Sequence, residues 1–187
     1  MQMPRPNGWP VRPDREGGAS GGATEQVLAR MASLMPGAVT VDADSVGACP
    51  SEPGAYLLLL LVGQSAVIEH RHATVTFAPG WYAYAGSAYG PGGIRARVRR
   101  HLRRDKKPHW HVDRLTALAQ TVDAFALPGG TECALVEILS DSGLFRHALP
   151  GFGSSDCRQC ASHLLVWQSQ ESASFSASAR SVRSHGK

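Results

Sequence analysis

The side chains of this sequence that are best placed to do chemistry are eight basic residues gathered at positions 95–107. They are Arg95, Arg97, Arg99, Arg100, Arg103, Arg104, Lys106 and Lys107, out of 19 lysines and arginines in the whole chain. Asp105 is the only acid among them. Such a density of positive charge favours a polyanionic partner, and we interpret it as a phosphate-facing surface. A surface helix that is arginine-rich only for solvation is the alternative.

The periodicity of this segment predicts a helix with one apolar stripe that faces the core. The stripe consists of Ile94, Val98 and Leu102. Arg97 and His101 are four positions apart, so they lie one above the other beside the stripe. We expect the helix to pack on the preceding strand, which carries Tyr82 and Tyr84. Tyrosine, arginine and histidine side chains would then converge at one junction between sheet and helix.

The rest of the sequence predicts an α+β domain in which a small, mainly antiparallel sheet is flanked by helices. Leu57–Val62 is a continuous apolar run and is expected to be a central strand buried on both faces. The other expected strands are Val67–His70, Thr74–Phe77, Trp81–Gly86, Thr121–Leu127 and His163–Trp167. Further helices are expected to follow Pro108, up to about Ala119, and to run from Glu132, after the capping residue Thr131, to about Ser140.

Length and composition indicate one folded domain with two tails. Residues 1–23 are expected to be a disordered, mildly basic arm, and 24–52 a short helix starting near Thr24 followed by an irregular linker. Residues 53–168 form the domain itself, and the serine-rich residues 169–187 a disordered tail. The longest apolar run has eight residues, which is short of the ~20 that span a membrane. We expect no membrane partner and a cytoplasmic location with reduced cysteines.

Several short motifs occur in a definite order along the predicted elements. Gly54-Ala55-Tyr56 and Tyr84-Ala85-Gly86 resemble the two signature tripeptides of the GIY-YIG nuclease superfamily. The run Ile94-x-x-Arg97-x-x-x-His101 resembles the helix that follows them there, and Glu132 resembles the superfamily's metal-binding glutamate. The segments GSAYGPGG, KPHWHVD, TEC and GFGSSDC are similar to a small prokaryotic branch of the superfamily whose cellular role is unassigned. The resemblance extends from Gly54 to Trp167.

This resemblance implies a metal-dependent endonuclease that hydrolyses phosphodiester bonds in DNA, or less readily in RNA. It implies that Glu132 holds one Mg²⁺ or Mn²⁺, for which a carboxylate is a suitable ligand. Tyr56 would orient or deprotonate the attacking water, and Arg97 would contact the scissile phosphate with its planar fork. Tyr84 and His101 would complete the proton network.

Two departures from the superfamily pattern have consequences. The tripeptides are unusually far apart, which predicts an inserted hairpin around Val67–Phe77. The asparagine often found late in the superfamily core is missing, since Asn7 is the only asparagine in the chain. A nucleic-acid-binding module that keeps the fold without turnover is therefore the alternative function.

A second group of residues is predicted to bind nucleic acid through charge and stacking. It consists of Arg100, Arg104, Lys106, Lys107, His109 and Trp110. The alternative for Trp110 is that it fills the core while the neighbouring histidines make structural hydrogen bonds.

Cys157, Cys160 and His163, with Cys133 elsewhere in the chain, provide enough ligands for a tetrahedral zinc site. The spacing is not that of a zinc finger, and the second half of a standard site is absent. We therefore expect free thiols near the core and regard zinc as an unlikely cofactor, with a zinc-stabilised interaction domain as the weakest functional alternative.

Overall fold

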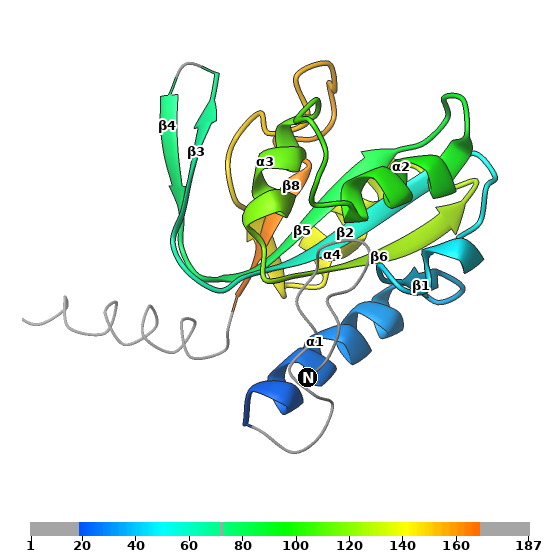
Figure 1. Cartoon of the computed structure of the whole chain (residues 1–187), viewed down its shortest axis with the longest axis horizontal. Coiled ribbons are helices and arrows are strands. Elements are labelled where there is room, and N and C mark those ends of the chain that lie inside the picture. The colour runs from blue at the N-terminus through cyan, green and yellow to red at the C-terminus, as the bar shows by residue number, and fades with distance from the viewer. Residues whose placement is uncertain (1–18, 72, 169–187) are drawn as a thin grey trace, which may run out of the picture.

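The computed structural model describes residues 19–71 and 73–168. These residues form a six-stranded antiparallel sheet with the strand order β1-β6-β2-β5-β8-β7 and a separate two-stranded sheet, β3-β4 (Figure 1). Helices lie against both faces of the larger sheet. The predicted α+β class with a mainly antiparallel sheet is confirmed.

The bounds of most elements agree with the hydrophobic pattern. The strands are β1 (Val39–Val41), β2 (Gly54–Val62), β3 (Ala66–His70), β4 (Ala73–Phe77), β5 (Gly80–Ser87), β6 (Thr121–Pro128), β7 (Phe145–His147) and β8 (Leu164–Trp167). The helices are α1 (Ala19–Leu34), a short 3₁₀ turn η1 (Val46–Ala48), α2 (Gly93–Leu102), α3 (His111–Leu118) and α4 (Glu132–Asp141).

The centre of the sheet is β2, which pairs with β5 on one side and β6 on the other. Its leucines at 57–60 are fully buried, as expected for a strand covered on both faces. Tyr56 lies opposite Gly86 and Leu58 lies opposite Tyr84. Since side chains alternate between faces along a strand, this register places Tyr56 and Tyr84 on the same face of the sheet.

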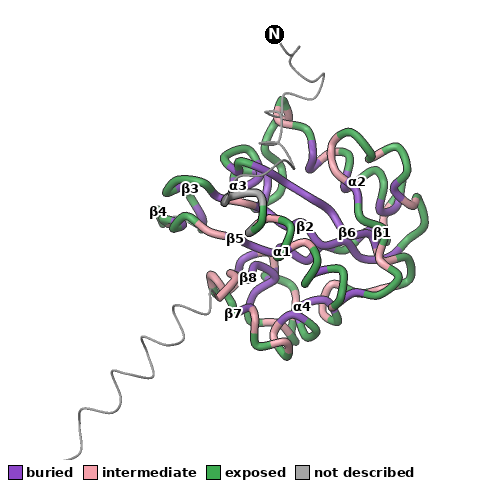
Figure 2. Tube along the Cα trace, turned by 90° about the horizontal axis from the view of Figure 1, so that it is seen from below, coloured by how far each residue is buried: buried purple, intermediate pink, exposed green. Residues whose placement is uncertain are grey.

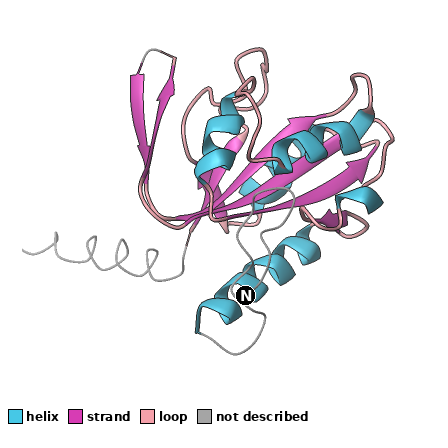
Figure 3. Cartoon of the chain, viewed as in Figure 1, coloured by secondary structure: helices cyan, strands magenta, loops and turns pink. Residues whose placement is uncertain are grey.

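The two faces of the sheet build two hydrophobic cores, seen in Figure 2 as buried segments along the central strands. The face that carries the tyrosines packs against α2 and α3, and the opposite face packs against α1 and α4 (Figure 3). The helical residues of the first core are Ile94, Val98, Leu102, Val112 and Leu115. Those of the second are Val27, Met31, Leu135, Val136 and Leu139.

The hairpin β3-β4, which follows β2 and precedes β5 in the chain, extends away from one end of the main sheet (Figure 3). In β3 the buried side chains alternate with exposed ones, so one face of the hairpin packs on the domain. This is the inserted hairpin that the long separation of the two tripeptides predicts.

Three local predictions were wrong. The linker expected within residues 24–52 is not wholly irregular, since it contains β1 and η1. In addition, no prediction covered the edge strand β7. Helix α1 begins at Ala19 rather than near Thr24; the rest of the predicted arm, and the predicted tail 169–187, lie outside the described residues. Helix α2 packs mainly on β2 and β6 instead of on the preceding strand. Among the described helices, none is long and apolar enough to cross a membrane.

Candidate active site

Glycines fix the position of α2 above the sheet. Gly92, at the start of the helix, has φ +82°, and Gly93 has φ +56°. A Cβ atom on Gly93 would overlap the carbonyl oxygen of Ser51, so only glycine allows this close approach. The amide of Ile94 then donates to the carbonyl of Glu52 at 3.2 Å. These contacts hold the start of α2 beside the start of β2, where Tyr56 lies.

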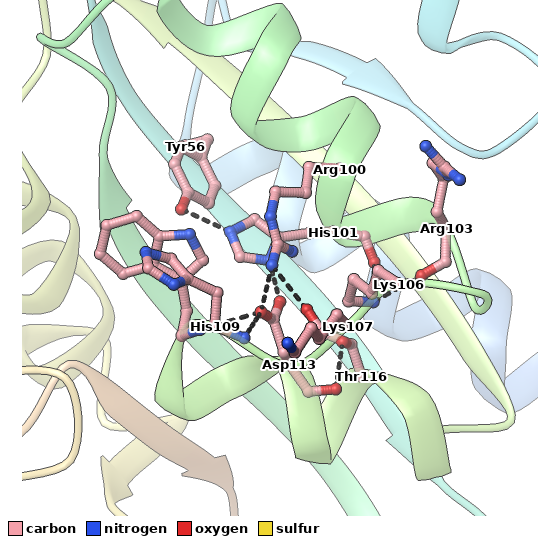
Figure 4. Close-up of polar contacts among 10 residues, drawn as sticks. Tyr56, Arg100, His101, Arg103, Lys106, Lys107, His109, Asp113 and Thr116 are labelled. Atoms are coloured by element: carbon pink, nitrogen blue, oxygen red, sulfur yellow. Dashed lines mark hydrogen bonds and ion pairs between the residues drawn. The ribbon is translucent and has the colours of Figure 1, made fainter.

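A chain of three buried polar side chains connects β2, α2 and α3 (Figure 4). The Tyr56 hydroxyl lies 2.9 Å from Nε2 of His101, and Nδ1 of His101 lies 3.0 Å from Oδ1 of Asp113. Their exposed fractions are 4%, 1% and 0% respectively. Because the carboxylate accepts a hydrogen bond from Nδ1, the other ring nitrogen is left to accept one from the tyrosine hydroxyl.

Asp113 is held as a carboxylate by several donors. The backbone amides of His109 and Trp110 each donate to its Oδ2 at 2.9 Å, and Nη2 of Arg100 lies 3.0 Å from the same oxygen. Burial alone would raise the pKa of Asp113, but the hydrogen bonds from His101 and from the two backbone amides outweigh it, and the pKa is lowered. Since Asp113 is the third residue of α3, the same contacts cap the helix.

His101 is neutral in this setting. Burial lowers its pKa, and the opposing effect of Asp113 does not restore the ordinary value. A neutral imidazole that is oriented by a carboxylate can accept a proton from the tyrosine that it faces. The arrangement therefore has the parts of a proton relay from the sheet to α3.

Tyr84 lies beside Tyr56 on the same face of the sheet and is 8% exposed. Burial, followed by the negative charges of Asp113, Glu132 and Asp156, raises its pKa to about 12. Burial also raises the pKa of Tyr56, so that both tyrosines carry their protons at neutral pH.

Glu132 is half-buried and is the first residue of α4. The preceding residue, Thr131, caps the helix, since its hydroxyl accepts a hydrogen bond from the amide of Ala134 at 3.3 Å. The predicted cap is thus confirmed. Helix α4 covers the opposite face of the sheet, but the negative charge of Glu132 is one of the causes that raise the pKa of Tyr84 on the tyrosine-bearing face. A carboxylate is the kind of ligand that Mg²⁺ and Mn²⁺ take, but no set of three or more His, Cys, Asp and Glu ligands among the described residues includes Glu132.

Two further glycines give the tyrosine rings their space. A Cβ atom on Gly86 would overlap the ring of Tyr56, its partner across the two strands. A Cβ atom on Gly153, which has φ +71°, would lie 2.7 Å from Cε2 of Tyr84. Gly86, the last residue of the second tripeptide, thus leaves room for the ring of Tyr56. Gly153, in the 151–163 loop that leads into β8, leaves room for the ring of Tyr84.

Arg97 and Trp110 form a cationic and aromatic surface next to the buried relay. The guanidinium carbon of Arg97 lies 5.1 Å from the centre of the Trp110 ring, and the ring of His109 meets that of Trp110 edge-on at 4.9 Å. Trp110 is 39% exposed, so the alternative that it fills the core is wrong. Arg97 is half-buried and His109 is exposed, which leaves both able to contact a ligand.

Most of the basic residues at 95–107 are engaged with the protein itself. Arg95 donates to the carbonyl of Cys49, Arg100 contacts Asp113, Arg103 pairs with Asp105, Arg104 donates to the carbonyl of Ala119, and Lys106 donates to the carbonyls of His101 and Arg103. Burial lowers the pKa of Lys106 to about 8. Arg99 and Lys107 are exposed. The positive charges remain, but fewer of these side chains are left to contact a ligand than the charge run suggests.

The structure brings the predicted residues Tyr56, Tyr84, Arg97 and His101 together at one end of the sheet. Glu132 lies within electrostatic reach of this group. Sequence reasoning missed Asp113, which orients His101, and did not foresee that Arg100 binds a carboxylate instead of facing outward. The signal that could have found Asp113 is its place three residues after Trp110, where an acid caps a helix.

The family model described as "Domain of unknown function DUF123" matches residues 55–184, which is more than half of the chain. No curated protein and no solved structure gives a match. The matched residues contain both tyrosines, the whole relay, Arg97 and Glu132. The chain therefore belongs to the DUF123 family.

Proposed function

We propose that this protein is a metal-dependent endonuclease of GIY-YIG type that hydrolyses phosphodiester bonds in DNA. The observation that carries the proposal is the Asp113–His101–Tyr56 relay, which lies next to Arg97 and Tyr84 on one face of the sheet. Apart from Asp113, these residues come from the two tripeptides and the helix in which the sequence resembles the superfamily. In addition, the four cysteines form no disulfide, which suits a reducing cytoplasm, and we propose this compartment as the location.

The relay gives a buried tyrosine a way to act as a base. Because the pKa of Tyr56 is raised, its hydroxyl does not ionise by itself at neutral pH. It can accept a proton from an attacking water only as its own proton passes to Nε2 of His101, 2.9 Å away. Asp113 stabilises the imidazolium that forms, as the carboxylate does in other carboxylate–histidine pairs.

Basic side chains and the metal ion would neutralise the negative charge of the phosphate. Arg97 offers a planar fork that can match two phosphate oxygens, and its guanidinium lies over the ring of Trp110. Glu132 would hold the divalent cation, which supplies charge neutralisation at the phosphoryl oxygens and an acidic bound water. Trp110 offers a face on which a base can stack, and Arg99 and Lys107 add exposed positive charge.

The test is a cleavage assay on supercoiled plasmid and on branched and flapped DNA, with Mg²⁺, Mn²⁺ or a chelator. Wild type is compared with Glu132→Gln and with Glu137→Gln, which changes an exposed glutamate on the same helix. We expect metal-dependent cleavage that is lost in Glu132→Gln and retained in Glu137→Gln. Cleavage that persists in Glu132→Gln would contradict the proposed metal ligand.

A nucleic-acid-binding module without turnover is the second candidate. The observation that favours it is the deep burial of Tyr56, at 4% exposure, which restricts the approach of water to its hydroxyl. The missing asparagine points in the same direction. A module of this kind would bind DNA in chelator, with an affinity that falls steeply with salt, and would cleave nothing with any divalent ion.

A further inference from the structure

We propose that Cys133, Cys157, Cys160 and His163 bind a structural zinc ion. The ligand atoms of these four residues, one from each, all lie within 4.8 Å of one another. In a tetrahedral site with Zn–S of about 2.3 Å and Zn–N of about 2.0 Å, neighbouring ligand atoms are about 3.5–3.8 Å apart. The Sγ atoms of Cys133 and Cys157 are 3.5 Å apart, which is this spacing and is far longer than a disulfide bond.

The fold supplies the four ligands from two segments that are distant in the sequence. Cys133 is the second residue of α4, and the other three residues come from the 151–163 loop, which leads into β8. From the sequence alone free thiols are expected, because Cys-x-x-Cys-x-x-His is not a zinc-finger spacing and Cys133 lies far away in the chain. Cys133 completes the set through the tertiary structure, giving the Cys₃His composition that is common in structural zinc sites.

The local geometry suits a metal better than isolated thiols. The amide of Cys160 donates to Sγ of Cys157 at 3.3 Å, a contact that favours the thiolate form needed for coordination. His163 is 5% exposed, and its Nε2 has no hydrogen-bond partner among the described residues. Burying an imidazole nitrogen without a hydrogen-bond partner costs free energy. A metal ion or another partner that binds this nitrogen would remove the cost.

Four protein ligands fill a tetrahedron, so the ion would have no open position for substrate and its role is structural. On binding, the three thiols become thiolates and release their protons to solvent, with no change of oxidation state. The ion would tie the 151–163 loop to the first turn of α4. That loop places Gly153 against Tyr84, and that turn carries Glu132, so the site would fix two sides of the candidate active site.

The experiment is metal analysis of the full chain purified under reducing conditions without chelator. We expect a single zinc ion per chain, retained in Cys49→Ala, which changes a buried cysteine outside the cluster, and lost in Cys160→Ser and His163→Ala. His163→Cys, which offers a fourth thiolate, should restore the zinc. Glu132→Gln should keep the zinc even though it removes cleavage, so the failure of one proposal is distinguishable from the failure of the other.

A measurement on the unsubstituted chain covers the case in which the variants do not fold. Zinc is removed from the reduced protein and replaced by Co²⁺, whose tetrahedral thiolate complexes absorb in the visible region. Appearance of this absorption supports the site. A reduced chain that contains no zinc and takes up no Co²⁺, a Cys133–Cys157 disulfide in the isolated protein, or iron bound in place of zinc would overturn the proposal.

Discussion

The Tyr56 hydroxyl and Nε2 of His101 are 2.9 Å apart, although 45 positions separate the two residues in the chain. The contact joins the central strand to α2 through groups that are both almost completely buried. Asp113 extends it to α3.

Replacing Asp113 with asparagine should impair catalysis more than it impairs folding. The amide is similar in size, but it has no charge with which to stabilise an imidazolium on His101. We expect the cleavage rate to fall about 10²–10⁴-fold, with a loss of stability of a few kcal/mol because Arg100 and the backbone amides of His109 and Trp110 lose a charged acceptor. Single-turnover cleavage and urea denaturation measure the two effects. An Asp113→Asn enzyme with wild-type activity would contradict the relay.

The buried histidine should make folding stability depend on pH. Because the folded-state pKa of His101 is lowered, the unfolded chain binds a proton there first as the pH falls below about 6.5. This group therefore destabilises the fold as the pH falls from about 6.5, by up to about 1.4 kcal/mol per pH unit, until the folded-state pKa is reached.

The measurement is the unfolding free energy between pH 7.5 and 5 for wild type, His101→Gln and His147→Gln. His147 is exposed on β7 and serves as the control. We expect a flatter pH dependence in His101→Gln and an unchanged one in His147→Gln. Equal slopes in all three proteins would show that His101 is not held neutral by its surroundings.

Gly86 should tolerate no side chain, because a methyl group there would occupy the place of the Tyr56 ring. We expect Gly86→Ala to cost about 1–3 kcal/mol of stability through overpacking and to displace the tyrosine from His101, with loss of cleavage. Gly47→Ala is the matched control, because a Cβ atom at Gly47 meets nothing within 4 Å. Thermal unfolding compares the two variants, and a Gly86→Ala protein as stable as Gly47→Ala would contradict this packing.

The affinity for DNA should depend on fewer basic side chains than the sequence contains. Lys107 is exposed, so Lys107→Ala should weaken binding uniformly across DNA sequences and reduce the salt slope by about 1. Arg146→Ala, which removes an exposed cation from β7 at the sheet edge, should change neither quantity. Binding titrations in chelator over a range of salt concentrations give both values. Equal slopes for the two variants would place the DNA surface elsewhere.

The sequence predicted the long elements and the grouping of Tyr56, Arg97 and His101 because each depends on strong local periodicity or on a motif. It missed β1 and β7, which have three residues each and are too short for a hydrophobic pattern. It also missed the role of Asp113, which depends on how α3 is placed against α2. It named Cys133 with Cys157, Cys160 and His163 as possible ligands but expected free thiols, because Cys133 and Cys157 are 24 positions apart and only the fold brings them together. The position of Asp113 three residues after Trp110 marks it as a capping acid, but its contact with His101 arises from tertiary packing and cannot be deduced from the local pattern.

The most direct test of the account compares Tyr56→Phe with Tyr82→Phe in metal-dependent cleavage of DNA. Both changes remove one buried or half-buried hydroxyl from the same face of the sheet, but the Tyr82 hydroxyl donates to the carbonyl of Ala78, away from His101. Each should cost about 1 kcal/mol of stability. We predict that Tyr56→Phe abolishes cleavage while Tyr82→Phe retains it. Equal cleavage by both variants would contradict a catalytic relay through Tyr56 and leave the non-catalytic binding module as the better description.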